Sequence, residues 1–532
     1  MTGFLQKHQN KIFLVLVALI SASAGVYVAN CMKYAPWGFS DSAAYISAAR
    51  NFAAGKGLGL FTPDGTFAPL LIFAPLYSIL LSIFAAFKAD LVVTIRILDI
   101  LFFSILVAAS GWLFHQITKS FWLSLFFTIM IATTPILAVN YSSMMSEPLA
   151  MVLGVPGFLL LIHALNHNSS KWLIFSAILC GLSLLTRYAF MAFPAAGVLC
   201  VFLFSNNPLR KRFIEALKFG VISISPMLIW IILQLTSKNS IGARHYSMDF
   251  SFTDKIAQFF SGLYNVIKYW LPYRTNMIPG VQADVFRPIL LILFVVIIVF
   301  GLYRSIKKSA QSPRPVIGIF ALGSVSLIIS YLLVLLVTYS ISTEIISINE
   351  RMLSPLVPIF YALILTCALL VGQKTLPNIR FPFFGVLIAL FFVIFNARPF
   401  STYPIEVGNF PNGYTSPIWK ENPILAGEIA LPQDRTLITN APDIVLFYLN
   451  RSAYTLSATP ESGLSIGSQT SLEDMLHQQC AVLVLFDAHN TQRFEQLPDA
   501  ITSADIAALQ NQLDTLYAST HGMILADNNC SK

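Results

Sequence analysis

The stretch IFLVLVALISASAGVYV, residues 12–28, ends ten residues before FSDSAAYISAARNFAAGKG, residues 39–57. The first stretch is apolar over 17 residues, which is longer than the apolar core of a usual secretory signal and close to the length of a membrane span. The second has the polar start, the apolar helical face and the glycine-rich end of an amphipathic helix. A retained first span followed by an interfacial helix predicts a membrane protein.

The composition of the 532-residue chain agrees with that prediction. Hydrophobic residues make up 56% of it, the mean hydropathy is +0.71, and only 11% of the residues are charged. Soluble proteins carry about 25% charged residues, so these values exclude a disordered chain and a soluble enzyme with a polar surface. The six cysteines are too few for a disulfide scaffold, and none has zinc-binding spacing.

The charges divide the chain near residue 397. Residues 1–396 contain 27 basic and 11 acidic residues, whereas residues 397–532 contain 6 and 14. A basic excess in a membrane domain is typical of cytoplasmic loops and lipid-phosphate contacts, and no aromatic-basic RNA motif accompanies it. We therefore expect an all-α polytopic membrane domain at 1–396, a soluble α/β domain at 397–532, and no nucleic-acid partner.

Eleven apolar runs are candidate membrane spans. Three compact basic loops lie between the later runs, at 210–212, 304–314 and 374–380. If the N-terminus is inside, eleven spans place all three loops in the cytoplasm, as the positive-inside rule requires, and the C-terminal domain outside. The predicted spans are 12–31, 91–114, 121–140, 148–165, 172–186, 189–205, 214–235, 286–303, 316–340, 353–372 and 381–396.

Residues 69–87 are also apolar, and a span there would invert every later loop. Pro69 and Pro75 interrupt this run and leave about 12 unbroken residues, or roughly 18 Å of helix against the 30 Å of a bilayer core. We expect a re-entrant or juxtamembrane helix within one long external loop, residues 32–90. An ordinary short span is the alternative.

The C-terminal domain shows alternating elements after a connector rich in Pro, Gly and Asn at 401–417. Ser471 is placed to cap a helix, and 481–486 is apolar throughout, like a buried parallel strand. The predicted helices are 419–430, 442–449, 472–479 and 503–513, and the predicted strands are 436–439, 453–456, 481–486, 514–519 and 522–526. This alternation predicts a small α/β layer sandwich. Because it has no GxGxxG motif and no P-loop, we expect it to shape acceptor access or hold a partner, without chemistry of its own.

Cys480 and Cys530 are the only cysteines of this domain. One precedes the predicted strand 481–486 and the other follows the predicted strand 522–526, so both can lie at neighbouring strand ends. An oxidising exterior would permit a disulfide between them. Two free thiols are the alternative.

Two acidic residues at the predicted external boundary are candidate functional groups. Asp41 follows the first span, and Glu147 precedes Pro148 at the start of the fourth. Each could merely cap or stabilise a helix N-terminus, which is the structural interpretation. An acid at a membrane boundary with no adjacent Lys or Arg is nevertheless a functional candidate.

Basic residues at the same predicted face are candidates for binding a phosphate. Arg187 lies between the fifth and sixth spans, Arg351 follows Glu350 at the head of the tenth, and Arg244 and His245 lie in the loop after the seventh. At a membrane interface, an Arg side chain often serves only to place its guanidinium in water, without binding a ligand. A guanidinium also grips a phosphate with two parallel hydrogen bonds.

The order of these units resembles that of the membrane glycosyltransferases of the C-type fold, which use polyprenyl-phosphate sugars. The similarity is greatest to the aminoarabinose transferases of lipid A and the protein O-mannosyltransferases. It covers about residues 12–370 and rests on Asp41 before Tyr45 in a Gly-terminated helix, Pro75-Leu76-Tyr77, Glu147-Pro148, Leu185-Thr186-Arg187, and Arg351 to Pro355. Two features depart from the pattern: Glu147 stands where several relatives have Asp, and the α/β domain is not general in these families.

The resemblance implies an inverting transfer of a sugar from a polyprenyl-phosphate donor to a hydroxyl acceptor. Asp41 would be the general base, Glu147 a second acid that orients hydroxyl groups, and Arg351 the phosphate clamp. Further donor-binding candidates are Arg187, Arg244 and His245, and supporting candidates are Tyr45, Tyr77 and Glu350. No cofactor is required, although a divalent metal bridging Asp41 and Glu147 stays open without an evident third ligand.

The competing class is a flippase or transporter of lipid-linked sugars, in which polar groups would line a route. The sequence shows no inverted repeat and no paired Gly/Pro-broken spans, and the charges lie on one face. A non-catalytic scaffold would need neither Asp41 nor Glu147. We expect a multi-pass protein of the bacterial inner membrane with its C-terminal domain in the periplasm.

Overall fold

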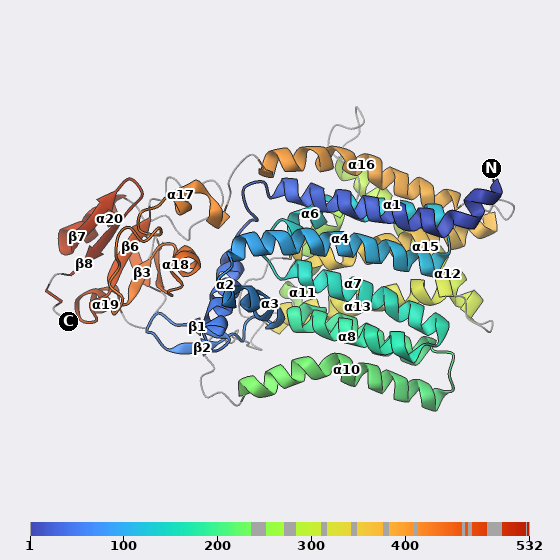
Figure 1. The fold of residues 1–532 in the computed structure, drawn as a ribbon, viewed down its shortest axis with the longest axis horizontal. Coiled ribbons are helices and arrows are strands. Elements are labelled where there is room, and N and C mark those ends of the chain that lie inside the picture. The colour runs from blue at the N-terminus through green and yellow to red at the C-terminus, as the bar shows by residue number, and fades with distance from the viewer. Residues whose placement is uncertain are drawn as a thin grey trace.

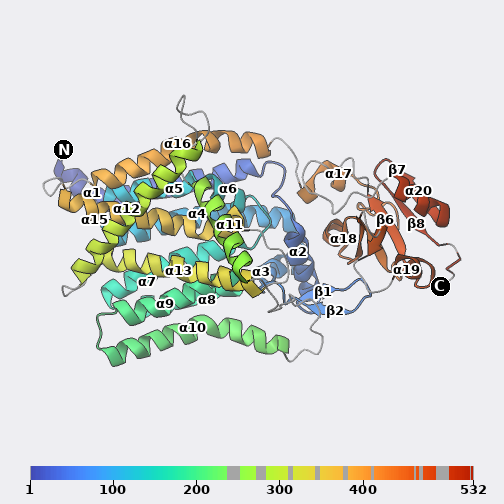
Figure 2. The same cartoon turned by 180° about the vertical axis from the view of Figure 1, so that it is seen from behind.

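The computed structural model describes residues 2–235, 252–270, 283–309, 316–341, 348–375, 382–408, 413–459, 463–466, 471–486, 503–527 and 529–530. It consists of a helical bundle with an α/β domain at one end (Figures 1 and 2). The N-terminus lies at the opposite end of the bundle (Figure 1). Short elements lie between the bundle and the α/β domain: α2 (Ser40–Ala53), α3 (Leu76–Ala86) and the hairpin of β1 (Gly59–Phe61) and β2 (Phe67–Pro69) (Figures 1 and 2).

Eight helices of the described chain are long and apolar enough to cross a membrane. They make the protein a multi-pass integral membrane protein. Their bounds are α1 (Thr2–Cys31), α4 (Leu91–Thr118), α7 (Glu147–His167), α10 (Leu209–Leu235), α12 (Ala283–Ser309), α13 (Val316–Ile341), α15 (Val357–Thr375) and α16 (Phe383–Gly408). The span containing α15 begins with α14 (Glu350–Leu353) and the 3₁₀ turn η2 (Ser354–Leu356).

The other predicted spans are present as helices but depart from a simple crossing. The run at 121–140 is broken into α5 (Phe121–Ala132) and α6 (Pro135–Tyr141), which are bent by 54°. Pro135 lies at the break, where its ring stops the preceding helix. The helices α8 (Ser170–Thr186) and α9 (Ala192–Phe204), joined by the 3₁₀ turn η1 (Tyr188–Met191), are shorter than a usual span.

The apolar run 69–87 forms no span-length helix. Its helical part is α3 (Leu76–Ala86), with 11 residues, which corresponds to about 16 Å at the rise of an α-helix. Before it comes the hairpin of β1 (Gly59–Phe61) and β2 (Phe67–Pro69), paired antiparallel. This hairpin was not predicted, although Pro63-Asp64-Gly65 is a turn signal and Gly65 has a φ of +84°.

A further helix was not predicted. The segment α11 (Phe252–Trp270) lies between the predicted spans 214–235 and 286–303. This helix is amphipathic, with apolar side chains on one face and polar side chains on the other. Such a pattern is typical of a helix that lies along an interface. Its Phe259 is buried, and Tyr339 of α13 donates a hydrogen bond to Gln258 at 3.2 Å.

The C-terminal domain has a mixed six-stranded sheet in the order β5-β4-β3-β6-β8-β7. The strand β3 runs parallel to both β4 and β6, whereas β6 and β8 are antiparallel. Its elements are η3 (Gly413–Thr415), α17 (Pro417–Lys420), β3 (Leu437–Thr439), α18 (Pro442–Leu449), β4 (Tyr454–Thr459), β5 (Gly463–Ile466), α19 (Leu472–His477), β6 (Val482–Phe486), α20 (Ser503–Gln512), β7 (Asp514–Ser519) and β8 (Gly522–Ala526). As predicted, every residue of β6 is buried.

Three details of this region differ from the prediction. The helix expected at 419–430 ends at Lys420, because Pro423 and Gly427, with a φ of +79°, favour turns. The strand β5 was not predicted. The helix α16 continues past residue 396 to Gly408 despite two internal prolines, so the helical bundle extends into the segment expected to be a connector.

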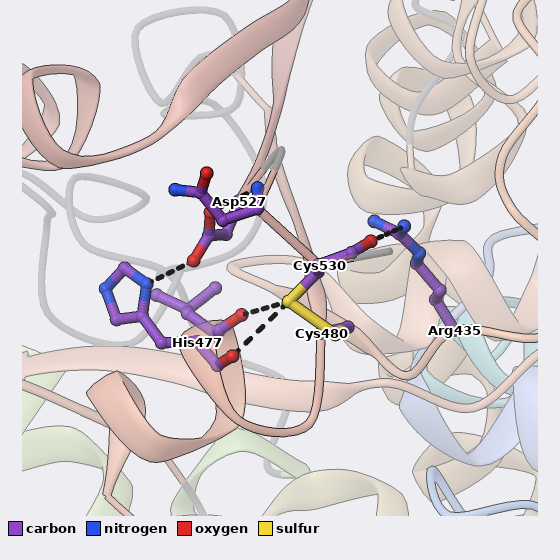
Figure 3. Close-up of a disulfide and its surroundings, with 7 residues drawn as sticks. Arg435, His477, Cys480, Asp527 and Cys530 are labelled. Atoms are coloured by element: carbon purple, nitrogen blue, oxygen red, sulfur yellow. Dashed lines mark hydrogen bonds and ion pairs between the residues drawn. A yellow bond between two sulfur atoms is a disulfide. The ribbon is translucent and has the colours of Figure 1, made fainter. Parts of the chain in front are cut away.

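Cys480 and Cys530 are bonded as a disulfide, with their Cα atoms 5.5 Å apart (Figure 3). Arg435 donates a hydrogen bond to the carbonyl oxygen of Cys530 at 2.8 Å. Beside the disulfide, Nδ1 of His477 lies 2.6 Å from Oδ2 of Asp527 (Figure 3). These contacts join α19 to the chain after β8.

Candidate active site

Asp41 lies in the first turn of α2 (Ser40–Ala53) and does not cap it. The N-cap position is Phe39, and no side chain caps the helix. The helix start is instead held by Ser42, whose hydroxyl accepts a hydrogen bond from the Phe39 amide at 2.9 Å and donates one to the carbonyl of Met144 at 2.7 Å. Asp41 therefore does not cap α2, although a carboxylate in the first turn still stabilises the helix N-terminus.

The loop before Glu147 is fastened to the loop before α2. Trp37 donates its amide to the carbonyl of Ser142 at 2.9 Å, and the Met144 amide returns a bond to the Trp37 carbonyl at 2.7 Å. Glu147 then begins α7, followed by Pro148 at a position where a proline costs no hydrogen bond. This pairing brings the two acidic motifs together although about a hundred residues separate them.

A bridged ionic network joins four side chains at this point. Nη2 of Arg351 lies 3.3 Å from Oδ2 of Asp41, and its Nε lies 3.0 Å from Oε1 of Glu147. On the other side, Nη1 of Arg187 lies 2.8 Å from Oε2 of Glu147. We call Asp41, Glu147, Arg187 and Arg351 the ionic network.

The members of the ionic network differ in their exposure. The Glu147 side chain is 2% exposed, whereas those of Arg187, Asp41 and Arg351 are 22%, 24% and 31% exposed. Two carboxylates and two guanidiniums cancel in formal charge. Glu147 is therefore the buried centre of the network, and its other three members are partly exposed.

Tyr45 lies beside the network, and Tyr77 contacts Tyr45. The Tyr45 hydroxyl lies 2.9 Å from the hydroxyl of Ser146, which also accepts a hydrogen bond from Arg187 at 3.3 Å. Burial raises the pKa of Tyr45 above that of a free phenol, so its hydroxyl stays protonated at neutral pH. The Tyr77 ring meets the Tyr45 ring edge-on, with centroids 5.2 Å apart.

The two arginines come from breaks between helices. Arg187 has an extended backbone, with a φ of −150°, between α8 and η1. Arg351 lies in the short helix α14, whose start is capped by Asn349 accepting from the Met352 amide at 3.0 Å. The carbonyl of Met352 in turn accepts a hydrogen bond from Tyr331 at 2.8 Å. Both arginine side chains reach Glu147, each at a different carboxylate oxygen.

The remaining predicted site residues lie elsewhere or are not described. Glu350 precedes Arg351 in α14, and none of the ion pairs in the described chain includes it. Arg244 and His245 fall outside the described residues. Within the described residues, no group of three or more His, Cys, Asp and Glu side chains could hold a metal ion. Between Asp41 and Glu147 the bridging cation is the Arg351 guanidinium.

Comparison with known proteins adds a structural relationship. No protein-family model matches the sequence, and no curated protein matches it. The structure resembles that of ArnT from Cupriavidus metallidurans in the apo state, with a TM-score of 0.55 and 14% sequence identity over 96% of this chain and 97% of that one. The chain has the fold of ArnT.

Two further solved structures show related similarity. ArnT bound to undecaprenyl phosphate matches with a TM-score of 0.53 and 10% identity over 96% of this chain and 97% of that one. Archaeal oligosaccharyltransferase AglB from Archaeoglobus fulgidus, in complex with an inhibitory peptide and a dolichol-phosphate, matches with a TM-score of 0.48 and 12% identity, over 91% of this chain and 70% of that one. The ArnT matches extend over both the bundle and the α/β domain, so the two parts form one shared architecture.

On this ArnT fold, several contacts of the site were not predicted from the sequence. Ser42 and Ser146 join the acidic motifs to one another and to Arg187, and Nη1 of Arg351 lies 3.8 Å from the sulfur of Met145. Ser146 directly precedes Glu147, so its position was the available signal. The partners of these serines are distant in sequence, and only the folded chain reveals them.

Proposed function

We propose that the chain is an integral-membrane glycosyltransferase that moves a sugar from a polyprenyl-phosphate donor to an acceptor hydroxyl on the external face. The observation that carries this proposal is the ionic network, in which four separate motifs converge at one end of the bundle. The ArnT fold supports it, since one ArnT structure contains undecaprenyl phosphate. The acceptor hydroxyl belongs to a protein, a lipid or a glycan.

The distribution of basic residues between the two ends of the bundle supports an external site. The basic residues 210–212 lie in the first turn of α10. That helix begins at the end of the bundle where the N-terminus lies, whereas the α/β domain covers the other end (Figures 1 and 2). The positive-inside rule assigns the basic end to the cytoplasm. An alkaline-phosphatase fusion after Lys532 should therefore be active in a bacterial inner membrane, and an inactive one would reverse the orientation.

The acidic members supply the base and an orienting group. A sugar acceptor hydroxyl has a pKa far above 7, so it needs a carboxylate within hydrogen-bond reach, which is typically worth about 10²–10⁴ in rate. Asp41 takes this role because it is the more exposed of the two acids of the network. Glu147, held by both arginines, orients hydroxyl groups and fixes the guanidiniums.

The arginines hold the leaving group. A guanidinium binds phosphate bidentately, so the donor phosphate competes with the carboxylates for Arg351. As Arg351 moves to the phosphate, a carboxylate oxygen of Asp41 becomes free to accept the acceptor's hydrogen bond. Arg187 keeps Glu147 paired during this exchange.

The transfer itself is one displacement at the anomeric carbon. The acceptor oxygen forms the new bond as the bond from that carbon to the phosphate oxygen breaks, and the anomeric centre inverts. The electron pair leaves with the lipid phosphate, whose growing charge Arg351 stabilises. The acceptor proton passes to Asp41.

Two measurements on purified protein test this function. Mass spectrometry of co-purified lipid should identify a polyprenyl-phosphate sugar. With that lipid radiolabelled in its sugar, the protein should transfer label to an envelope fraction from cells that lack the gene for this chain. Movement of the lipid across vesicle bilayers without transfer of the sugar would instead establish a flippase.

A further inference from the structure

A cavity lies where the α/β domain meets the bundle. Its volume is about 660 Å³, which is within the range of pockets that bind small ligands. The bundle side supplies the segment after α1, the end of α3 and the first turn of α4, and the domain side supplies residues of α17, of α18 and next to η3. Figure 1 shows α2, α17 and α18 at this boundary. The cavity therefore exists only where the two parts are packed together.

Three cations from three different elements line the cavity. Arg50 belongs to α2, Lys88 follows α3, and Lys420 ends α17. In the described chain, no ion pair includes any of them. The one acid among the described lining residues, Asp90, caps α4 by accepting a hydrogen bond from the Val92 amide at 2.8 Å. Three cations and one acid give the lining a formal charge of +2, which favours an anionic ligand.

Arg50 also links the two parts of the molecule. It is half-buried, and its Nη1 donates a hydrogen bond to the carbonyl of Phe447 in α18 at 2.6 Å. On the same face of α2, Ser47 donates to the Asn450 side chain at 2.6 Å, and Asn450 donates to Asn51 at 3.1 Å. A guanidinium has five N–H donors, so one bond to a carbonyl leaves donors for an anion. A phosphate is well suited, because it accepts two parallel bonds from a guanidinium.

The cavity lies at the surface of the membrane-spanning bundle. Tyr34, in its lining, comes three residues after the end of α1, and Leu91 begins α4. Both helices are long and apolar enough to cross a membrane. Tyr34 is 53% exposed, and tyrosine is enriched where the bilayer meets water. The phosphate groups of membrane lipids lie in this same zone.

An exposed apolar stripe leads away from the cavity along α4. Val93 lines the cavity. Ile97, Leu101 and Ile105 follow it at intervals of four residues, and residues four apart share one face of a helix. All four side chains are 50–53% exposed, so the stripe faces the hydrocarbon of the bilayer. A lipid whose phosphate lies in the cavity can therefore lay an acyl chain along this stripe.

We propose that the cavity binds the phosphate headgroup of an anionic membrane phospholipid, and that the bound lipid joins the α/β domain to the bundle. The phosphate pairs with Arg50, Lys88 and Lys420, so one ligand holds α2, the end of α3 and the domain together. Arg50 lies nine residues after Asp41 on α2, or about 14 Å along the helix. A phosphate in the cavity is thus too far from Asp41 to be the leaving group of the proposed transfer. Binding there does not require sugar transfer.

The first test measures the binding of a fluorescent short-chain phosphatidylglycerol to the full-length protein in detergent. Unlabelled phosphatidylglycerol should displace it, and phosphatidylcholine with the same chains should do so about tenfold less well, because its headgroup has no net charge. Two soluble competitors distinguish a lipid from a free phosphate. Inorganic phosphate, and the phosphatidylglycerol headgroup without acyl chains, should both displace it poorly. Displacement by inorganic phosphate as strong as by the lipid would overturn the assignment to a phospholipid.

The second test removes two of the three cations. Lys88 and Lys420 are exposed, so the Lys88→Gln/Lys420→Gln protein should keep the unfolding temperature of wild type in the absence of lipid. Its affinity for phosphatidylglycerol should fall by about tenfold. The matched control is Lys56→Gln/Lys171→Gln, which removes two exposed lysines that do not line the cavity. The control should bind like wild type, and equal weakening in both double variants would overturn the proposal.

Two further readouts test the role and the identity of the lipid. In wild type, phosphatidylglycerol should slow hydrogen exchange at α18, and in the Lys88→Gln/Lys420→Gln protein it should not. Binding without slower exchange at α18 would contradict the link between the domain and the bundle. Undecaprenyl phosphate binding should be the same in the variant and in wild type. If it weakens in step with phosphatidylglycerol binding, the cavity belongs to the donor lipid, which overturns this inference and leaves the proposed function standing.

Discussion

Acidic side chains pair with basic ones both in the bundle and in the C-terminal domain, in very different surroundings. In the bundle, Glu147 is 2% exposed and is held by two arginines from distant segments. In the C-terminal domain, His477 is 43% exposed and pairs with Asp527 beside a disulfide. Buried charges are expensive to desolvate, whereas exposed pairs contribute little because water screens them. Under the proposed function, the bundle keeps this costly network for chemistry, whereas the exposed pair adds little to the C-terminal domain.

The largest effect is expected when the buried centre of the network is removed. Glu147→Ala leaves two guanidiniums without their shared partner, which typically costs about 3–5 kcal/mol of the free energy of unfolding. Thermal unfolding of the detergent-purified protein measures this loss. Lys211→Ala is the control, because it breaks a 3.9 Å pair with Glu215 in which the lysine is 62% exposed. Equal effects of the two variants would remove the distinction between the regions.

The second effect concerns the covalent link of the C-terminal domain. The loop between Cys480 and Cys530 spans 50 residues, and removing such a disulfide is expected to cost about 2–4 kcal/mol. In the protein substituted with Ala at both cysteines, amides of β6 and β8 should exchange faster, and those of the bundle should not. Thiol counting under denaturing, non-reducing conditions is the direct check: two titratable thiols from this domain would show that the disulfide is absent.

A smaller effect is expected at a helix start of the same domain. The Ser471 hydroxyl accepts a hydrogen bond from the Asp474 amide at 3.1 Å and caps α19. Ser471→Ala should cost about 1 kcal/mol, and Ser471→Asp should restore the cap. Hydrogen exchange at α19 measures both variants. If Ser471→Ala leaves this exchange unchanged, the cap contributes nothing to the helix.

The smallest effect is expected at the exposed pair. The hydrogen bond with His477 lowers the pKa of Asp527. A depressed carboxyl pKa stabilises the fold above the ordinary value of about 4 and loses that contribution as the pH falls through the lowered value. His477→Ala should therefore reduce stability at pH 6 by less than Ser471→Ala does, and should flatten the pH dependence below about 4. A larger loss than that of Ser471→Ala would mean that the exposed pair is a major support of the domain.

The sequence predicted elements with strong local signals. The bounds of α18, β7 and β8 agree with the predicted ranges 442–449, 514–519 and 522–526. The prolines in 69–87 correctly indicated that this run is too short to be a regular span. Each of these depends on the period of apolar residues or on a Pro or Gly at a boundary, which are local properties.

The packing of the two domains and the assembly of the site depend on contacts between segments that are distant in sequence. The packing of α18 on α2 joins residues about 400 positions apart through single hydrogen bonds. No local sequence pattern predicts this contact. The convergence of Asp41, Glu147, Arg187 and Arg351 was implied only by the family resemblance. The position of Arg351 between the carboxylates of Asp41 and Glu147 is seen only in the folded chain.

The most direct test of the catalytic role of the ionic network is the turnover of Asp41→Asn. Asparagine keeps the shape of the side chain but does not accept a proton at neutral pH. If Asp41 is the general base, turnover with the labelled polyprenyl-phosphate sugar should fall by about 10²-fold or more. Undecaprenyl phosphate binding and the unfolding temperature should stay close to those of wild type, because Arg351 and Arg187 remain in place. Turnover near that of wild type would contradict the role of Asp41 and leave Glu147 as the base.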